Sequence, residues 1–260
     1  MAGKTKISFP TPEPASQTLD IRGHIALITG GGRRIGAQCV RALSRAGAKV
    51  VVHCHHSTDD AMALCQEIQA RGGHSWLVEA DLGDGNAMED LIPRIEKTIG
   101  PLSILINNAA IFEPGTTLGT TRDQWDRHLD INLTAPFFLM SQFAKQLPRE
   151  APGKIINIID QRVLRPAPGH AAYTAAKSAL WSLTRMAAVE LAPNIQVNAI
   201  GPGAILPAQQ DNEATFQALV QSLPIQRPGR LEEITSALLF FLANDYVTGQ
   251  MVCIDGGQHL

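Results

Sequence analysis

The architecture is first indicated by residues 25–36, which read Ile25-Ala-Leu-Ile28-Thr29-Gly30-Gly31-Gly32-Arg33-Arg34-Ile35-Gly36. Its first four residues are apolar, which predicts a buried strand, and Ile35, Cys39 and Leu43 have the spacing of the buried face of a helix. The glycines between them let the backbone turn sharply and approach a pyrophosphate, which would lie at the amino end of that helix. An isoleucine replaces the last glycine of the strict G-x-G-x-x-G pattern, so the turn alone is a weak signal. The signal is stronger because this turn belongs to the first strand-turn-helix unit of an alternating chain. Two arginines also add positive charge beside the place where phosphates would lie.

Further apolar runs predict six more strands, and helical patterns separate them. These strands are Val50–Val52, Ser75–Val78, Leu102–Ile106, Lys154–Ile159, Ile195–Ile200 and Met251–Ile254. Strands that alternate with helices form a parallel sheet that is covered on both faces. The sequence therefore predicts an α/β fold: a single Rossmann-like doubly wound domain with a seven-stranded parallel sheet.

Length and composition place the chain in a narrow class. It has 260 residues, of which 45% are apolar, and no linker-like stretch divides it, so we expect one domain over residues 21–260 after a flexible tail over residues 1–20. The net charge of −2 argues against nucleic-acid binding, and no apolar run is long enough for a membrane span. The four cysteines form no C-x-x-C pair, which favours a reduced, cytoplasmic protein.

The end of the second predicted strand reads His53-Cys54-His55-His56-Ser57, with no carboxylate before Asp59. Folds that bind NAD commonly place Asp or Glu here to hold the ribose hydroxyls, and an acid would repel the 2′-phosphate of NADP. Histidine, serine and a nearby arginine can instead donate hydrogen bonds to that phosphate. These residues therefore favour NADPH as the cofactor.

The same residues raise the alternative of a metal cluster. On a strand, His53 and His55 would share one face while Cys54 and His56 share the other, so the four ligands would not converge. The sequence shows no obvious Cys/His pair elsewhere to complete a zinc site. We therefore expect no metal.

Tyr173 and Lys177 are candidates for catalysis because positions i and i+4 share a helix face. A phenol titrates near ~10, and an adjacent ammonium favours the phenolate, so Lys177 is expected to lower the pKa of Tyr173 and allow proton transfer near neutral pH. Asp160 follows a predicted strand, and its carboxyl is expected to face the crevice where doubly wound folds bind ligands. Where Tyr-x-x-x-Lys occurs alone, the two side chains more often only cover the surface of a helix. A catalytic role therefore depends on the other motifs of the chain.

Six motifs lie along the chain: Thr29-Gly30-x-x-x-Arg34-x-Gly36, Asp81-Leu82, Asn107-Asn108-Ala109-Ala110, Asn132, Tyr173-x-x-x-Lys177 and Pro202-Gly203. Together they resemble the short-chain dehydrogenase/reductase family over residues 22–260. Most members have a glycine in place of Arg34 and a serine in place of Asp160. Those departures, with the turn His55-His56-Ser57 and with Phe112, resemble the pteridine reductase branch. The glycine turn and the closing Asp255-Gly-Gly-Gln-His-Leu260 also resemble bacterial dihydromonapterin reductases.

The resemblance implies NADPH-dependent reduction of dihydropterins of the dihydrobiopterin or dihydromonapterin kind, with dihydrofolate as a further candidate. Asp160, Tyr173 and Lys177 would be catalytic. The cofactor-binding residues would be Gly30, Arg33, Arg34, Ile35, His55, His56, Ser57, Asp81, Leu82, Asn108, Ala109, Tyr173, Lys177, Pro202 and Gly203. The substrate-binding residues would be Arg34, Phe112, Asp160 and Tyr173.

The resemblance also implies supporting roles. Asn132 would support Lys177 through water, and the helices that carry Asn132 and Tyr173 would form the interfaces of a homotetramer. The segment Ala204–Gln217 is expected to shape the pocket for the substrate side chain.

The two departures also make chemical sense. A ketone reductase needs a neutral hydroxyl at the carbonyl oxygen, where an aspartate would repel developing negative charge. A pterin needs a proton on a ring nitrogen, which a carboxyl of raised pKa can donate. Phe112 is expected to stack on the flat ring, and Arg34 to bind the pterin and the cofactor phosphates. The plainer alternatives are an Asp160 that only caps the strand end and a Phe112 that belongs to the core.

Two other functions stay open. The chain would be a carbonyl reductase, for example of a 3-oxoacyl thioester, if Tyr173 acted alone, and Asp160 and Arg34 argue against that. It would be a non-catalytic dinucleotide sensor if the site only bound cofactor. The intact pair of Tyr173 and Lys177 argues against a sensor.

Overall fold

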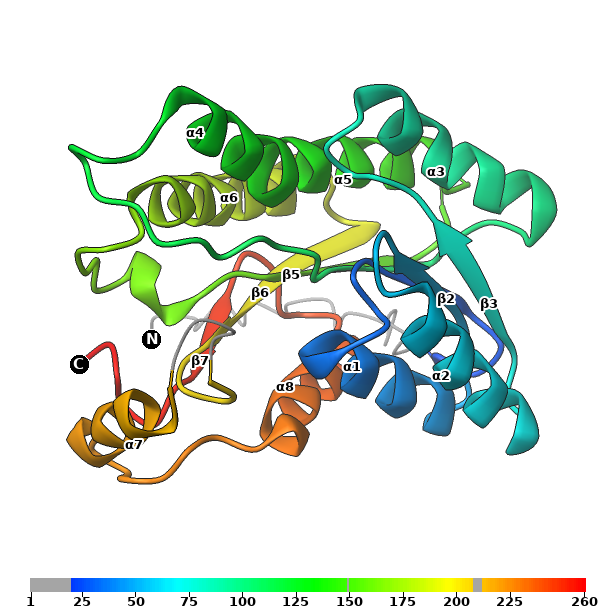
Figure 1. Ribbon diagram of the computed structural model, residues 1–260. Helices are drawn as coiled ribbons and strands as arrows, with labels where there is room; N and C mark the ends of the chain where they lie inside the picture. Colours follow the sequence, from blue (N-terminus) through cyan, green and yellow to red (C-terminus); the bar gives the residue numbers. More distant parts are fainter. Residues whose placement is uncertain (1–19, 149, 208–211) are drawn as a thin grey trace, which may run out of the picture.

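The computed structural model describes residues 20–148, 150–207 and 212–260. Its seven strands form one sheet in the order β3-β2-β1-β4-β5-β6-β7, and every neighbouring pair is parallel (Figure 1). The strands are β1 Ile25–Ile28, β2 Lys49–Cys54, β3 Ser75–Glu79, β4 Ile104–Asn107, β5 Gly153–Ile158, β6 Ile195–Pro202 and β7 Met251–Ile254. The predicted doubly wound parallel sheet is confirmed. The tail predicted for residues 1–20 lies outside the described residues except for Asp20.

Helices cover both faces of the sheet. They are α1 Arg34–Arg45, α2 Thr58–Ala70, α3 Gly85–Thr98, α4 Arg122–Leu129, α5 Ala135–Gln146, α6 Ala171–Glu190, α7 Glu213–Ser222 and α8 Leu231–Ala243, with a 3-10 turn at Gln161–Val163. Figure 1 shows α1, α2 and α8 below the sheet and α3, α5 and α6 above it. Strand residues alternate between two cores: Ala26 and Ile28 belong to one and Leu27 to the other. Because the side chains within the strands are used by the two cores, the side chains available to a ligand are those that follow the ends of the strands.

The strand order places a crevice at the carboxyl ends of β1 and β4. The chain builds β1, β2 and β3 outward in one direction, and β4 then returns to the other side of β1. The loops that follow these two strands therefore leave the sheet in opposite directions, and ligands bind at such switch points in open α/β sheets. The sheet topology thus puts the glycine turn after β1 and the Asn-Asn-Ala-Ala segment after β4 side by side.

The sequence did not predict the π-helical turn Asp130–Thr134, which joins α4 to α5. Asn132 lies in this turn and is fully buried. Turns of this kind inside helices are frequent at functional sites. No helix in the described part of the chain is both long and apolar enough to span a membrane.

Candidate active site

The glycine turn is held against the end of β4 by side-chain hydrogen bonds. The Thr29 hydroxyl accepts from the backbone N–H groups of Asn108 (2.9 Å) and Ala109 (3.0 Å). The Asn108 amide donates to the carbonyls of Thr29 (2.9 Å) and Gly30 (3.1 Å). A Cβ at Gly36 would lie 2.2 Å from the Gly30 oxygen, so only glycine fits there. The turn is therefore held in place, and Gly30, Asn108 and Ala109 lie side by side.

The amino end of α1 suits an anion. The helix has no side-chain cap and no acid in its first turn, so its first N–H groups are left to bind a ligand. Arg34 is exposed, and its backbone φ is +51°, a left-handed conformation that favours glycine. This conformation explains why most of the resembling proteins carry glycine there. The Arg34 guanidinium donates to the Pro207 carbonyl (2.8 Å), so it reaches from the glycine turn to the segment after β6.

Arg33 lies differently from what the sequence suggested. Its guanidinium forms an ion pair with Asp60 in the first turn of α2. The expected positive charge beside the phosphate position is therefore partly neutralised by a carboxylate. Of the two arginines in this turn, Arg34 is the one that has no carboxylate partner among the described residues.

The turn after β2 brings two histidines together. β2 ends at Cys54, so the strand alternation does not extend to His55 and His56, and the expectation that they lie on opposite faces is wrong. Their rings contact each other with centroids 3.5 Å apart. His55 Nδ1 lies 3.6 Å from a carboxylate oxygen of Asp81, the residue expected to line the adenine pocket. Ser57 begins α2 and makes no side-chain cap, which leaves its hydroxyl for a ligand.

His53 has a structural role. It is buried; its Nδ1 accepts from the Gly30 N–H (3.1 Å), and its Nε2 donates to the Ala80 carbonyl (3.1 Å). Burial lowers its pKa to about 4, so the ring is neutral and its tautomer is fixed by these two partners. His53 thus ties the glycine turn to the end of β3, while His55 and His56 stay at the surface of the crevice.

Asp160, Tyr173 and Lys177 form one cluster, in which Tyr173 and Lys177 are buried and Asp160 is half-buried. The Tyr173 hydroxyl donates to Asp160 Oδ2 (3.0 Å), and Asp160 Oδ1 accepts from the Arg162 N–H (2.7 Å). The carboxyl therefore caps the turn after β5 with one oxygen and contacts the tyrosine with the other. Lys177 Nζ donates to the Ile158 carbonyl (2.8 Å), and the lysine side chain is buried. Capping and a catalytic position are thus compatible for Asp160.

The pKa shifts in this cluster correct one prediction. Burial and the neighbouring Asp160 raise the pKa of Tyr173 well above its usual value, so the expectation that Lys177 lowers it is wrong for the protein without ligands. Burial lowers the pKa of Lys177 to about 8. Burial also raises the pKa of Asp160, in the direction expected for a proton-donating carboxyl. The pKa of Asp160 therefore shifts toward the range in which a carboxyl can hold and donate a proton, whereas the pKa of Tyr173 shifts further from neutrality.

Phe112 is half-buried and belongs to this cluster rather than to the core. Its ring stacks on His170 at 4.0 Å with an interplanar angle of 8° and meets the Tyr173 ring edge-on at 4.7 Å. No sequence pattern pointed to His170, which precedes α6 and reaches Phe112 only through the fold.

Asn132 makes a different contact from the one implied by resemblance. Its amide oxygen accepts from the Ile111 N–H and its amide nitrogen donates to the Ile111 carbonyl, each at 3.0 Å. Among the described residues, its hydrogen bonds go to Ile111 rather than to Lys177. Asn132 therefore holds the backbone beside Phe112, and support of Lys177 through water stays a prediction.

The remaining predicted residues follow β1 and β3 or lie at the end of β6. Leu82 is buried beside Asp81, and Ile35 lies in the first turn of α1. Pro202 ends β6, and the Gly203 N–H donates to the Ile254 carbonyl (3.0 Å). Within the segment expected to shape the substrate pocket, residues 208–211 lie outside the described residues.

A second cluster of titratable groups follows β7. Ligand atoms of Cys253, Asp255 and His259 lie within 4.8 Å of one another, a grouping that the sequence analysis did not find. Both Asp255 oxygens accept hydrogen bonds, one from the Gly257 N–H and the other from the His259 N–H and ring. These contacts give Asp255 the role of ordering the closing turn. All four cysteines are free thiols, and a cytoplasmic location stays a prediction.

Comparisons with known proteins cover nearly the whole chain. A family model described as enoyl-(acyl carrier protein) reductase matches residues 31–259. A 3-oxoacyl-[acyl-carrier-protein] reductase from Synechocystis is 33% identical over 243 residues, which are 92% of this chain and 98% of that protein. The crystal structure of FolM alternative dihydrofolate reductase 1 from Brucella canis, complexed with NADP, is 39% identical with a TM-score of 0.89 and covers 92% of this chain and 95% of that chain.

A further solved structure is also similar over nearly the whole chain. It is a blue fluorescent protein from a metagenomic library, in complex with NADPH, which is 33% identical with a TM-score of 0.86. The similarity covers 92% of this chain and 99% of that chain.

Proposed function

We propose that this chain, which belongs to the short-chain dehydrogenase/reductase family, is an NADPH-dependent reductase of dihydropterins, with dihydrofolate as a second candidate substrate. The NADP-dependent oxidoreductase chemistry follows from the family and from its solved relatives, which hold NADP or NADPH. The choice of a pterin rests on the residues of the cluster after β5.

One observation carries the pterin assignment: the hydroxyl of the buried Tyr173 donates a hydrogen bond to Asp160 Oδ2 (3.0 Å). Burial and the neighbouring Asp160 raise the pKa of the phenol, which makes Tyr173 a poor acid for a carbonyl oxygen. Burial raises the pKa of Asp160 itself, which makes its protonated form a suitable donor to a ring nitrogen. The arrangement therefore supports protonation of a heterocycle over protonation of a ketone.

The proposed roles follow from this arrangement. When bound, NADPH supplies the hydride. Asp160, in its protonated form, would donate a proton to the pterin ring nitrogen. The Tyr173 hydroxyl would stabilise the carboxylate that remains and relay the replacement proton from water, taking up one proton as it gives one. Lys177 holds the nicotinamide ribose, and its ammonium lies close enough to act on the charge of Asp160.

The cofactor phosphates fit the other side of the crevice. The uncapped amino end of α1 and the Arg34 guanidinium suit the pyrophosphate. His55, His56 and Ser57 suit the 2′-phosphate, with Asp81 and Leu82 at the adenine. Asn108, Ala109, Pro202 and Gly203 complete the proposed binding site, together with Gly30, Arg33 and Ile35.

Phe112 and Arg34 are the proposed substrate contacts outside the catalytic cluster. Phe112 meets Tyr173 edge-on, so a flat ring lying against Phe112 would be near the proton donors. Arg34 reaches toward the segment after β6 and can donate hydrogen bonds to a pterin from there.

The second candidate is reduction of a 3-oxoacyl thioester, which the 3-oxoacyl reductase relatives favour. In that reaction Tyr173 would protonate the carbonyl oxygen and Asp160 would have no favourable role. The two candidates therefore predict opposite outcomes for the same substitution.

Asp160→Ser is the test. A serine there should depress dihydropterin turnover, abolish the pH dependence that belongs to the carboxyl, and permit some turnover of reactive ketones. The measurement is a pH–rate profile of both proteins with a dihydropterin, with dihydrofolate and with a diketone. If the substitution leaves dihydropterin turnover and its pH profile unchanged, Asp160 is structural and the assignment loses its main support.

We also propose a homotetramer that uses α5 and α6 as interfaces. These helices carry exposed apolar side chains, with Phe137 43%, Met186 55% and Val189 80% exposed. Apolar surface of this extent on a helix pair is typical of a protein interface. Light scattering coupled to gel filtration should give four chains, and Val189→Glu should reduce that number.

A further inference from the structure

The segment of residues 111–115 carries Phe112 and has no regular secondary structure of its own. A free loop would let the Phe112 ring move relative to Tyr173. In this protein the segment is held from two sides, by α4 and by the residues that precede α6.

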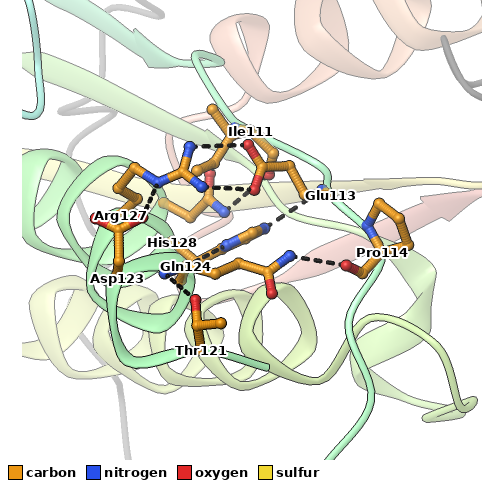
Figure 2. Close-up of polar contacts among 9 residues, drawn as sticks. Ile111, Glu113, Pro114, Thr121, Asp123, Gln124, Arg127 and His128 are labelled. Carbon is orange, nitrogen blue, oxygen red and sulfur yellow. Dashed lines mark hydrogen bonds and ion pairs between the residues drawn. The ribbon is translucent and has the colours of Figure 1, made fainter. Parts of the chain in front are cut away.

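Helix α4 provides polar side chains to the segment (Figure 2). Arg127 forms a two-pronged ion pair with the Glu113 carboxylate, with distances of 3.1 and 3.2 Å. The Gln124 amide donates to the Pro114 carbonyl (2.7 Å). His128 is fully buried, is fixed by the Gln124 carbonyl (2.8 Å), and accepts from the Glu113 N–H (3.4 Å).

The opposite side of the segment pairs with the residues before α6. The Gly115 N–H donates to the Gly169 carbonyl (2.7 Å), and the Ala171 N–H donates to the Gly115 carbonyl (2.9 Å). The stack of Phe112 on His170 extends this contact to side chains. The segment is therefore joined to the start of the same helix that carries Tyr173.

The alternation of side chains in an extended segment explains the geometry. Glu113 points to α4, where Arg127 holds it, and its neighbour Phe112 points the other way, to the Tyr173 ring. Asn132 fixes the residue on the other side, Ile111, through both backbone groups. Phe112 is thus flanked by two fixed residues: Ile111 is bonded to the π turn, and Glu113 is bonded to α4.

We propose that Glu113 and Arg127 are positioning residues for the substrate: their ion pair holds Phe112 at a fixed distance from Tyr173 and so sets the preference for flat, bicyclic substrates. This inference rests on the proposed function for the identity of the flat ring. The clamp itself, defined as the contacts of Glu113 with Arg127 and His128, does not.

The ion pair is a suitable target because it lies at the surface. The side chains of Glu113 and Arg127 are about a third and a half exposed, and pairs of that kind contribute little to fold stability. Arg127→Ala should therefore fold normally, and its effect should appear in substrate binding. Arg122→Ala is the matched control, because Arg122 makes an ion pair with Asp126 on the same helix and none with the segment.

Two measurements test the proposal. Hydrogen exchange of residues 111–115 should become faster in Arg127→Ala and stay unchanged in Arg122→Ala. A misplacement of about 1 Å can reduce a rate by ~10²-fold, so kcat/KM for a dihydropterin should fall at least about tenfold, mostly through KM. The Kd for NADPH and turnover of a small diketone should change by less than about twofold, and Arg127→Lys should restore part of the loss.

Each outcome decides something. Unchanged exchange in Arg127→Ala would show that the ion pair does not hold the segment, and faster exchange with unchanged KM would show that the held segment does not position substrate. A wild-type protein that reduces ketones and no dihydropterin would overturn the proposed function instead. The positioning role is then judged by the ratio of kcat/KM for an aromatic and an aliphatic ketone, and an equal ratio in wild type and Arg127→Ala would overturn it.

Discussion

The two sides of the crevice treat charge in opposite ways. On the side of β1 and β2, charged groups lie at the surface and pair with one another, as Arg33 does with Asp60 and His55 with Asp81. On the side of β5 and α6, Asp160, Tyr173 and Lys177 lie together in a buried site, and burial shifts the pKa of each. The first arrangement suits recognition of a charged ligand, and the second suits proton transfer.

The difference has a simple physical origin. Water screens exposed charges, so each contact on the phosphate side contributes little and can be replaced by a neighbour. In the cluster of Asp160, Tyr173 and Lys177, charged groups interact more strongly because water is largely excluded. A water molecule cannot replace a partner that a substitution removes. Substitutions on the catalytic side should therefore have large effects on rate, and those on the phosphate side should have smaller, graded effects on affinity.

The largest effect is expected for Tyr173→Phe. Loss of a group that takes part in proton transfer typically costs ~10²–10⁴-fold in rate, so kcat for a dihydropterin should fall by that order. The hydroxyl also lowers the pKa of Asp160 by its hydrogen bond, so residual activity should persist to higher pH than in the wild type. Thermal unfolding and NADPH affinity serve as controls. A loss below about tenfold would remove Tyr173 from the mechanism.

The paired substitution His56→Ala/Ser57→Ala should have the next largest effect. Because His56 is exposed and Ser57 half-buried, we expect their two hydrogen bonds to the phosphate to contribute about 1.5–3 kcal/mol together, so NADPH affinity should fall by roughly 10–100-fold. NADH lacks the 2′-phosphate and should bind almost unchanged. Fluorescence titration with both coenzymes measures the contrast. Equal weakening of both would mean that this turn does not contact the phosphate.

Lys177 gives the buried side a pH dependence of cofactor binding. Burial lowers its pKa to about 8, so the ammonium loses its proton as the pH rises through that value. The negative cofactor favours the charged lysine, and binding should raise this pKa, so NADPH affinity should fall several-fold between about pH 7 and pH 9.5. Lys177→Met should bind more weakly at every pH and show no such slope. A slope that survives in Lys177→Met belongs to another group.

The same contrast explains what could be predicted from the sequence. The sheet follows from apolar runs and helical spacing, and the shared face of Tyr173 and Lys177 follows from helix geometry, because both are local patterns. The preference for NADPH was predicted from the turn after β2, because that turn contains no carboxylate. Arg33 precedes α1, whereas Asp60 lies on α2. Their contact depends on how the helices pack and could not be inferred from the spacing of residues in the sequence.

The catalytic side shows where the prediction of the pKa failed. The motif puts Lys177 one helical turn from Tyr173, and a lysine in water would lower the pKa of the phenol. In the fold, Asp160 comes from the strand side, bonds the hydroxyl, and acts together with burial in the opposite direction. The stack of Phe112 on His170 is likewise non-local, since it joins the loop after β4 to the start of α6.

The smallest expected effect concerns the ion pair of Arg33 with Asp60. Asp60→Asn removes the carboxylate that neutralises Arg33 and should free the guanidinium for the cofactor phosphate. Exposed pairs are worth about 0.2–1 kcal/mol, so NADPH affinity should rise by no more than about fivefold, and more at low salt than at high salt. Arg33→Ala should weaken NADPH by a similar factor, and the double variant should match Arg33→Ala if Asp60 acts only through Arg33. Asp60 also lies in the first turn of α2, where an acid favours the helix, so a small loss of thermal stability should accompany the gain. If Asp60→Asn binds NADPH no better than the wild type at any salt concentration, Arg33 does not reach the phosphate, and recognition on this side rests on Arg34, His56 and Ser57.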